Sequence, residues 1–382
     1  MLEPPAMSRA QWFFVSVFAV ACRPSTPSTP PEPPVSPEPP ALWVADGPWQ
    51  AIGGTEYPGK QDDVVFVSPK VGFYGNGSGA VLRTDDGGDT WRELWKQPGT
   101  YVRALGFLDE RRGFLGNLGP DYFPGVTDDA MLYRTDDGGE HWTKVALPDT
   151  EGARGVCAID VLSVDFINAG VRDHKEIVHV GGRVGGPASL FRSDDGGDTW
   201  KRLALPPEAA MILDVHFVDV NTGFVFAGSD SNVEASNAVI LKTTDSGRSW
   251  RVAYRSTRPF ELTWKASFPT RDVGYATLQS YNPEPALAQR YVLKTTDGGD
   301  SWQELPLVVD PKAQTFGVGF VDERHGWIGG VPHGFETRDG GATWTAVPEL
   351  GVATNKIRIV PDGDARAVFG IGKDLRRLRL HR

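Results

Sequence analysis

The chain has 382 residues, among them 45 Gly, 30 Pro and 12 Trp but only 4 Met. Glycine and proline at this density divide a chain into short segments, and aromatic residues suit the half-buried faces of β-sheets. The formal net charge of −10 argues against a nucleic-acid partner, because binding to phosphates needs a basic face. These features favour an all-β protein that does not bind nucleic acid.

The first 22 residues have the features of a bacterial export signal. An apolar run from Trp12 to Ala21 follows Arg9. It is shorter than the roughly 20 residues that a membrane-spanning helix needs, but it has the length of a signal-peptide core. The run ends in AVAC, residues 19–22, which resembles the lipobox of bacterial lipoproteins. The resemblance implies that Cys22 is acylated and becomes the first mature residue.

Other interpretations of this N-terminus stay open. The signal could be an ordinary cleaved secretion signal or an uncleaved anchor, and Met1 or Met7 could be the start, since Glu3 is unusual in a region that should be positive. If Cys22 is lipidated, the following Arg23 resembles the pattern of outer-membrane rather than inner-membrane retention. We therefore expect a lipid-anchored protein of the bacterial cell envelope, with secretion as the alternative.

A proline-rich segment follows the signal. Residues 24–40 read PSTPSTPPEPPVSPEPP, a composition that cannot form a core and favours extended, semi-rigid conformations. We predict that residues 1–22 are the signal, residues 23–42 a disordered linker and residues 43–382 the folded domain.

Six segments of the folded domain align without gaps: RTDDGGDTW (83–91), RTDDGGEHW (134–142), RSDDGGDTW (192–200), KTTDSGRSW (242–250), KTTDGGDSW (294–302) and ETRDGGATW (336–344). They match the Asp-box, or BNR repeat, Ser/Thr-x-Asp-x-Gly-x-Ser/Thr-Trp, in which only His141 replaces a hydroxyl residue. Aspartate and glycine are turn formers, so each box predicts a hairpin between antiparallel strands. The predicted structural residues are Asp86, Trp91, Asp137, Trp142, Asp195, Trp200, Asp245, Trp250, Asp297, Trp302, Asp339 and Trp344.

The sequence around the boxes repeats as well. An apolar strand, a polar turn and a Gly-aromatic pair lie upstream, as in Phe107–Phe114, Phe217–Phe224 and Phe320–Trp327, and another strand follows each Trp. One unit therefore has four strands, which is the blade of a β-propeller.

The tryptophans give the number of blades. Trp49 matches a strand that follows a box, and the series Trp49, Trp91, Trp142, Trp200, Trp250, Trp302 and Trp344 has steps of 42 to 58 residues. After Trp344 come three strand-like runs at 356–360, 366–370 and 375–380. Pairing them with the strand at Trp49 completes a seventh blade and leaves no free sheet edge at the join. We predict a seven-bladed propeller of four-stranded antiparallel blades, with the last blade closed by the N-terminal strand.

In Asp-box propellers the boxes lie on the face away from the binding face. The resemblance therefore implies a structural role for the boxes and places function on the loops opposite them. The DDGG run lacks the spaced acids and the Glu at position twelve of an EF-hand loop, so no metal and no cofactor are expected.

Long loops on a rigid scaffold often carry function, and three long segments stand out, 116–130, 227–238 and 278–290. Three further residues lie where inner strands begin and could surround the channel mouth. The binding candidates are Arg103, Asp121, Tyr122, Phe123, Asp128, Asp230, Asn232, Glu234, Arg258, Trp264, Tyr281, Asn282 and Arg290.

Two functions remain. Over residues 43–382 the chain resembles the photosystem II stability/assembly factor group of BNR proteins, and more loosely the sortilin ectodomain, which implies a non-catalytic, monomeric scaffold that binds protein or glycan at the envelope. Sialidases also carry Asp-boxes, so a sialidase-like glycoside hydrolase is the alternative. Their early Arg-Ile-Pro signature is missing here, and Arg358-Ile-Val-Pro361 is broken by Val360. We therefore favour binding without catalysis and name no catalytic residue.

Overall fold

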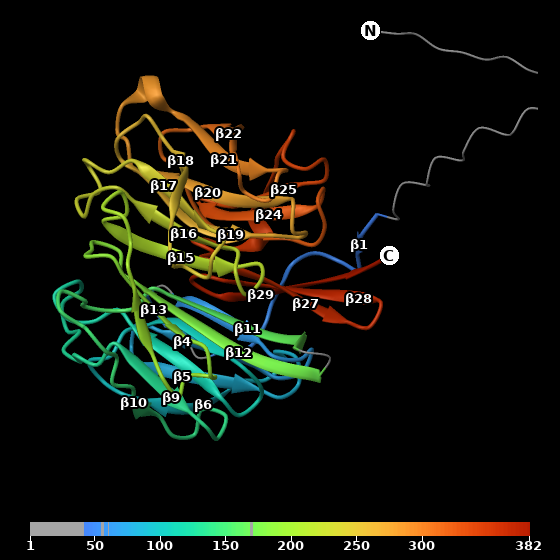
Figure 1. Cartoon of the computed structure of the whole chain (residues 1–382). Coiled ribbons are helices and arrows are strands. Elements are labelled where there is room, and N and C mark those ends of the chain that lie inside the picture. The colour runs from blue at the N-terminus through green and yellow to red at the C-terminus, as the bar shows by residue number, and fades with distance from the viewer. Residues whose placement is uncertain (1–41, 55–56, 60, 169–170) are drawn as a thin grey trace, which may run out of the picture. The chain divides into compact units, whose positions relative to one another are not determined.

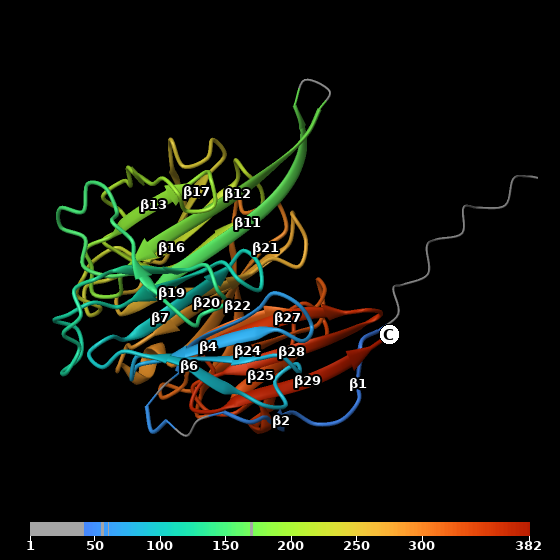
Figure 2. The same ribbon diagram turned by 90° about the horizontal axis from the view of Figure 1, so that it is seen from below.

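The computed structural model describes residues 42–54, 57–59, 61–168 and 171–382. The predicted signal peptide, Cys22 and the proline-rich linker lie outside the described residues. Residues 42–382 form one compact unit, which consists of seven antiparallel sheets (Figures 1 and 2).

Six sheets take their four strands in chain order. The first three blades are β3 (Gln61–Phe66), β4 (Gly72–Asn76), β5 (Ala80–Thr84) and β6 (Arg92–Lys96); β7 (Val102–Phe107), β8 (Gly113–Asn117), β9 (Leu132–Thr135) and β10 (Thr143–Lys144); and β11 (Ala158–Asn168), β12 (Val171–Gly182), β13 (Ser189–Ser193) and β14 (Lys201–Leu203).

The next three blades follow the same order. They are β15 (Met211–Phe217), β16 (Gly223–Gly228), β17 (Ala238–Thr243) and β18 (Arg251–Arg255); β19 (Glu261–Ser267), β20 (Gly274–Ser280), β21 (Gln289–Thr295) and β22 (Gln303–Val309); and β23 (Gln314–Phe320), β24 (Gly326–Val331), β25 (Gly334–Thr337) and β26 (Thr345–Val347). Two 3₁₀ turns, η1 (Pro285–Leu287) and η2 (Pro348–Leu350), lie between strands.

The seventh sheet joins the two ends of the folded domain, as predicted. It contains β27 (Lys356–Asp362), β28 (Ala365–Ile371) and β29 (Leu375–His381), and the N-terminal strands β1 (Val44–Ala45) and β2 (Gln50–Ala51) both pair with β29. Gln50 lies opposite Arg377, and Trp49 packs edge-on against Trp327 at 5.8 Å. The first strands of all seven blades contact one another in a ring that includes β27 against β3. The seven-bladed, N-terminally closed propeller is therefore confirmed.

The repeated Phe-turn-Gly-aromatic pattern forms the contact between blades. Phe107 stacks on Phe73 of the preceding blade at 3.7 Å, and Phe320 stacks on Tyr275 in the same way at 3.5 Å. A Cβ atom at Gly113 would lie 2.4 Å from the Phe107 ring, so only glycine lets this ring cross the second strand. Such aromatic pairs add about 0.5–1.5 kcal/mol each beyond their buried area.

The connections divide the propeller into two faces. The turns between first and second strands and the Asp-box turns between third and fourth strands lie at one end, which we call the Asp-box face. The loops between second and third strands and the links between blades lie at the other end, which we call the loop face. The β11–β12 hairpin extends well beyond its neighbours (Figure 2). This hairpin accounts for the longest step, 58 residues, in the tryptophan series.

Candidate functional site

Each Asp-box is a closed network of short hydrogen bonds. In the first box, Asp86 accepts bonds from the Thr84 hydroxyl at 2.7 Å, the Thr90 backbone N–H at 2.9 Å and the Thr90 hydroxyl at 2.6 Å. The bond from the Thr90 hydroxyl is the main reason that the pKa of Asp86 falls to about 2. Both carboxylate oxygens are thus engaged in the turn.

The departures from the box pattern keep this geometry. His141 stands in place of the second hydroxyl, and its Nδ1 lies 2.7 Å from Asp137 Oδ2. Most boxes have glycine with positive φ after the aspartate, but the fourth has Ser246 at φ 65°. The Ser246 hydroxyl donates to Val220 O at 3.0 Å, a contact that accompanies the unusual backbone. Five box aspartates accept the same three bonds, and in the second box the His141 ring takes the place of the hydroxyl donor, which supports a structural role for the boxes.

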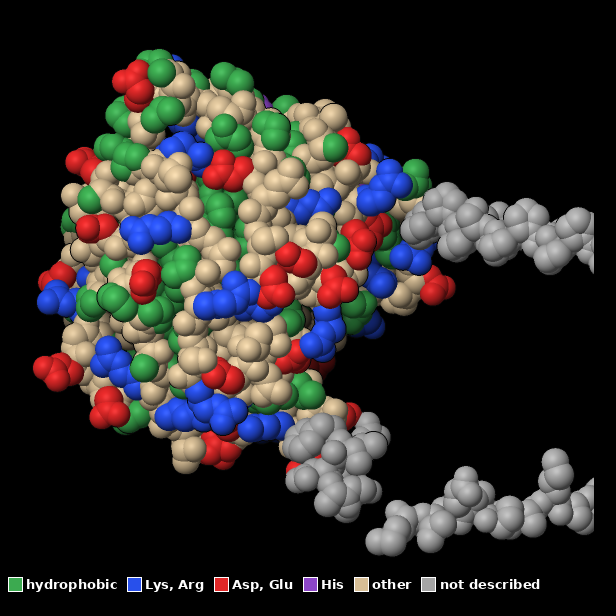
Figure 3. All heavy atoms as spheres, turned by 45° about the horizontal axis from the view of Figure 1, so that its top comes forward, with side chains coloured by type: hydrophobic (Ala, Val, Ile, Leu, Met, Phe, Trp, Pro, Cys, Tyr) green, Lys and Arg blue, Asp and Glu red, His purple; other side chains and the backbone are tan. Residues whose placement is uncertain are grey.

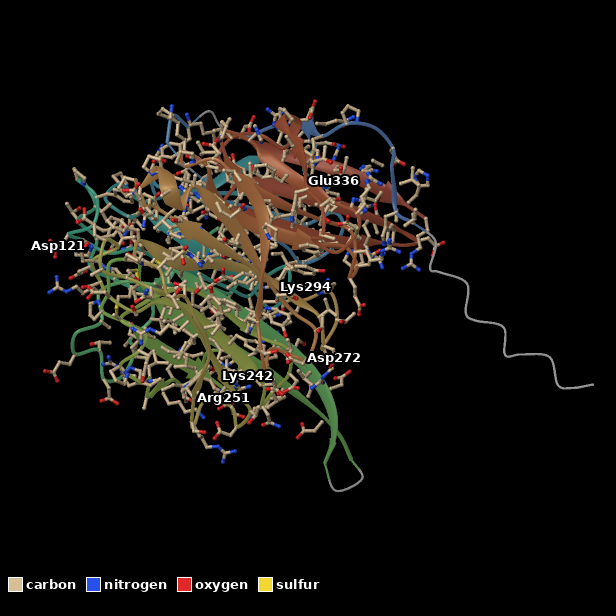
Figure 4. All side chains as sticks on the ribbon, turned by 90° about the horizontal axis from the view of Figure 1, so that it is seen from above. Asp121, Lys242, Arg251, Asp272, Lys294 and Glu336 are labelled. Carbon is tan, nitrogen blue, oxygen red and sulfur yellow. The ribbon has the colours of Figure 1, made fainter. Side chains whose placement is uncertain are left out.

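A second feature of the Asp-box face was not predicted. The basic residue before each of the first five boxes reaches the next blade: Arg83 to Glu110 O at 3.0 Å, Arg134 to Asp198 at 2.6 Å, Arg192 to Val220 O at 3.3 Å, Lys242 to Asp300 at 2.6 Å and Lys294 to Gly340 O at 2.9 Å. In blade six, Glu336 stands in place of the basic residue before the sixth box. Blade seven has no box, and there Arg377 bonds Gly87 O at 2.9 Å and Asp89 at 2.7 Å. In Figure 4, Lys294 and Glu336 lie far from Asp121 of the loop face. On the Asp-box face, polar side chains of these blades therefore bond the neighbouring blade.

The candidates in segment 116–130 divide into exposed and buried residues. Tyr122 is 37% and Phe123 44% exposed, and their rings contact each other at 4.8 Å. Asp121 is exposed and lies 3.6 Å from Arg154. Asp128 is turned inward, where its carboxylate accepts from the Thr100 hydroxyl at 2.6 Å and the Tyr133 hydroxyl at 2.7 Å. Of these four candidates, the three at the tip of the segment are exposed and Asp128 is not.

Most polar candidates in segments 227–238 and 278–290 form hydrogen bonds within their own loops. Asp230 accepts the Asn232 N–H at 2.8 Å, Asn232 accepts the Glu234 N–H at 3.0 Å, and Asn282 accepts the Glu284 N–H at 2.9 Å. Glu234 remains exposed.

Two side chains of the 278–290 segment point inward. Arg290 is 1% exposed and donates to the carbonyls of Ala313, Leu287 and Pro311 at 2.6–3.0 Å. Tyr281 is half-buried and donates to Gln279 at 2.9 Å. This segment offers less free polar surface than its sequence suggests.

The three candidates expected at the channel mouth do not form one group. Arg103 and Trp264 lie together and are buried, with the guanidinium 5.4 Å from the ring centroid and 3.1 Å from Asp62. Arg258 instead bonds Glu261 at 2.6 Å and Glu304 at 2.9 Å. Arg103 and Trp264 thus belong to the interior of the channel rather than to an accessible rim.

A large cleft on the loop face, between blades three and four, was not predicted. We call it the arginine cleft; its volume is about 950 Å³, and its lining includes Arg154, Arg183 and Arg202 but neither Asp nor Glu among the described residues. Arg183 is 4% exposed and donates to Leu118 O at 3.0 Å and Pro120 O at 2.8 Å. Burial is the main cause that lowers the pKa of Arg183, while the charge of Asp121 acts in the opposite direction. Among the described residues no carboxylate forms a direct salt bridge with Arg183, so the cleft contains a buried cation held by backbone carbonyls.

A second cleft lies on the other side of Tyr122 and Phe123. We call it the aromatic cleft; it has a volume of about 620 Å³ and is lined by Tyr57, Tyr101 and Phe123 together with glycine and proline residues. The described lining carries no charged side chain. Gly77 lies so close to the Tyr57 and Tyr101 side chains that a Cβ atom there would be 2.6–2.7 Å from them. This glycine keeps the cleft open between the two rings.

Sequence reasoning missed the residues of both clefts except Phe123. Arg154, Arg183 and Arg202 are isolated in the sequence, so no local motif marks them. The pair Gly185-Gly186 beside Arg183, both with positive φ, is the one local signal of a tight backbone at this place.

Among the described residues, no group of three or more His, Cys, Asp or Glu side chains could hold a metal ion. No helix in the described part of the chain is both long enough and apolar enough to cross a membrane. On the face that Figure 3 shows, acidic and basic side chains are interspersed.

The sequence of the chain is similar to that of a known assembly protein. No family model matches the chain. The chain is similar to the photosystem II assembly lipoprotein Ycf48 of Synechococcus sp. strain CC9902, with 26% identity over 327 residues that cover 73% of this chain and 85% of the relative.

Solved structures share the fold. YCF48 bound to a D1 peptide has a TM-score of 0.60 and 17% identity, over 88% of this chain and 96% of that one. YCF48 from Cyanidioschyzon merolae has a TM-score of 0.58 and 16% identity, over 88% and 99%. The GH74 xyloglucanase from Xanthomonas campestris has a TM-score of 0.59 and 15% identity, over 86% of this chain but 52% of the enzyme. The sequence relative and the shared architecture together show that the chain folds as a Ycf48-like seven-bladed β-propeller.

Proposed function

We propose that the chain is a non-catalytic assembly scaffold that binds a segment of another protein through its loop face. The observation that carries this proposal is the buried guanidinium of Arg183 in the arginine cleft, whose bonds go to backbone carbonyls. A buried charge without a counter-charge is costly. A carboxylate entering the cleft would satisfy that cation through charge-assisted hydrogen bonds. An acidic side chain of a partner is therefore the ligand that fits.

The similarity to known assembly proteins also supports protein binding. The Synechococcus relative is an assembly lipoprotein, and one solved YCF48 has a bound peptide. From these similar proteins we transfer to this chain only the binding of a protein segment, and not a photosynthetic role. The exposed Tyr122 and Phe123 beside the cleft supply the aromatic surface that protein interfaces prefer.

We also propose that the scaffold acts at the bacterial cell envelope. In this proposal residues 1–22 are a lipoprotein signal, Cys22 carries the lipid, residues 23–42 form the linker and residues 43–382 form the propeller. The lipoprotein character of the Synechococcus relative supports the anchor.

The alternative, a glycoside hydrolase, needs two opposed carboxylates at its site. The described lining of the arginine cleft contains neither Asp nor Glu, which favours binding over hydrolysis. Turnover of a fluorogenic sialoside by the purified chain would overturn the proposal.

The direct test places a photo-crosslinking residue at position 123 of the full chain in its native envelope. We expect one partner segment to be captured there, and capture to fall when Arg154, an exposed arginine of the cleft, is changed to Glu. The matched controls are a crosslinker at Ala342, which is exposed in the sixth box on the Asp-box face, and Arg255→Glu on an outer strand. Equal capture at positions 123 and 342, or no effect of Arg154→Glu, would refute binding through the loop face.

A further inference from the structure

The two clefts are connected by a row of side chains in contact with one another. The Arg183 guanidinium lies 5.6 Å from the Tyr122 ring, Tyr122 lies 4.8 Å from Phe123, and Phe123 lies 5.1 Å from Tyr101. Arg183 lines the arginine cleft and Tyr101 lines the aromatic cleft. Tyr122 and Phe123 therefore form a ridge, which we call the aromatic ridge, with one cleft on each side.

The clefts on either side of the ridge differ in chemistry. The arginine cleft is lined by three guanidinium groups, one of which, that of Arg154, also lies 3.6 Å from Asp121. The aromatic cleft offers rings and glycine backbone without charge in its described lining. Aromatic grooves free of charge accept apolar side chains or proline, whereas arginines select carboxylates. A single type of side chain could not satisfy both.

We propose that the two clefts act as one bipartite site, which recognises an extended peptide segment with an acidic residue and an apolar anchor at a fixed separation. The acidic residue enters the arginine cleft, the chain crosses the aromatic ridge, and an aromatic or long aliphatic residue enters the aromatic cleft. This inference rests on the proposed function, since it assumes that the loop face binds a protein segment.

The separation of the two anchors follows from the row of side chains. Its three contacts are each 4.8–5.6 Å long, so the row spans at most about 16 Å. An extended chain advances about 3.3 Å per residue. The acidic residue and the apolar anchor should therefore lie no more than about five positions apart in the partner's sequence.

The test uses fluorescein-labelled Gly/Ser peptides, each with one Glu and one Phe, at separations of two to eight positions and in both orders. Binding to the full chain is measured by fluorescence polarisation. We expect the highest affinity at one separation of no more than about five positions. Binding should be about tenfold weaker when either anchor is replaced by Ser, which corresponds to about 1.4 kcal/mol.

Two variants assign the anchors to the clefts. Arg154→Glu should weaken binding of peptides that contain Glu and leave Phe-only peptides unaffected. Phe123→Ala should weaken binding of peptides that contain Phe and leave Glu-only peptides unaffected. Arg255→Glu and Val309→Ala, both exposed elsewhere, should change neither. Circular dichroism of each variant checks that the propeller is intact.

The outcomes separate this inference from the proposed function. Affinity that does not depend on the separation, failure of every peptide to bind, or binding of an acidic oligosaccharide as tight as that of the best peptide would overturn the bipartite site. Site-dependent crosslinking at position 123 would still support protein binding in those cases. Loss of that crosslinking would instead remove the proposed function itself.

Discussion

The closing strand at Trp49 gives the sharpest test of the fold. Trp49 is 7% exposed, packs against Trp327 and lies in a cluster with Val368, Leu378 and other core residues between blades six and seven. Trp49→Ala removes this ring and leaves a cavity, for which large-to-small core substitutions cost roughly 3–5 kcal/mol. We expect the free energy of unfolding to fall by that amount.

The assay is guanidinium unfolding followed by far-ultraviolet circular dichroism, because a tryptophan substitution would alter the fluorescence itself. The midpoint should fall while the slope stays near that of the wild type, as expected for a change in stability alone. Val44→Ala is the matched control, since this residue lies in the same N-terminal segment but is 49% exposed and should change stability by less than about 0.5 kcal/mol. A loss below about 1 kcal/mol for Trp49→Ala would mean that this strand does not complete the seventh blade.

Three further predictions concern the repeats. Gly113→Ala should cost about 1–3 kcal/mol in chemical unfolding, because its Cβ would lie 2.4 Å from the packed Phe107 ring, whereas Gly47→Ala, with open space around it, should be nearly neutral. Lys294→Met should cost about 1–2 kcal/mol in the same assay by removing the 2.9 Å bond to Gly340 O, while Lys312→Met on the surface should not. The pKa of Asp86 is lowered to about 2 in the folded state, so its contribution to stability is present above the unfolded pKa and is lost as the pH falls from about 4 to about 2. The melting temperature of Asp86→Asn should therefore decline less over that pH interval than that of the wild type. An equal decline in both proteins would contradict the hydrogen-bond network of the box.

The sequence predicted the fold because its signals are local and repeated. Each Asp-box marks one hairpin by its own residues, and Trp49 shows the missing fourth strand by matching strands that follow a box. The inter-blade bridges were harder to predict, although Arg83, Arg134 and Lys294 occupy one motif position. Their acceptors lie on the neighbouring blade, so position in the motif alone does not reveal the bond.

The candidate site was less predictable because it depends on which loops converge. Composition correctly drew attention to Tyr122 and Phe123 at a loop tip, but it could not distinguish them from Asp128, which is turned inward. The arginine cleft combines Arg183, which follows β12, with Arg202 of β14. No spacing rule joins these residues, since burial and loop conformation bring them together.

The route by which the chain enters and leaves the propeller has a practical consequence. β1 pairs with the last residues of β29, and Arg338 of the sixth box bonds Trp43 O at 3.4 Å, so both ends of the folded domain meet on the Asp-box side (Figure 1). A reporter fused to the carboxyl terminus, or a sensor chip coupled through it, would touch the molecule on the side away from the clefts. Immobilised in that way, the protein would turn its recognition surface toward the solution, with no need for a redesigned attachment point.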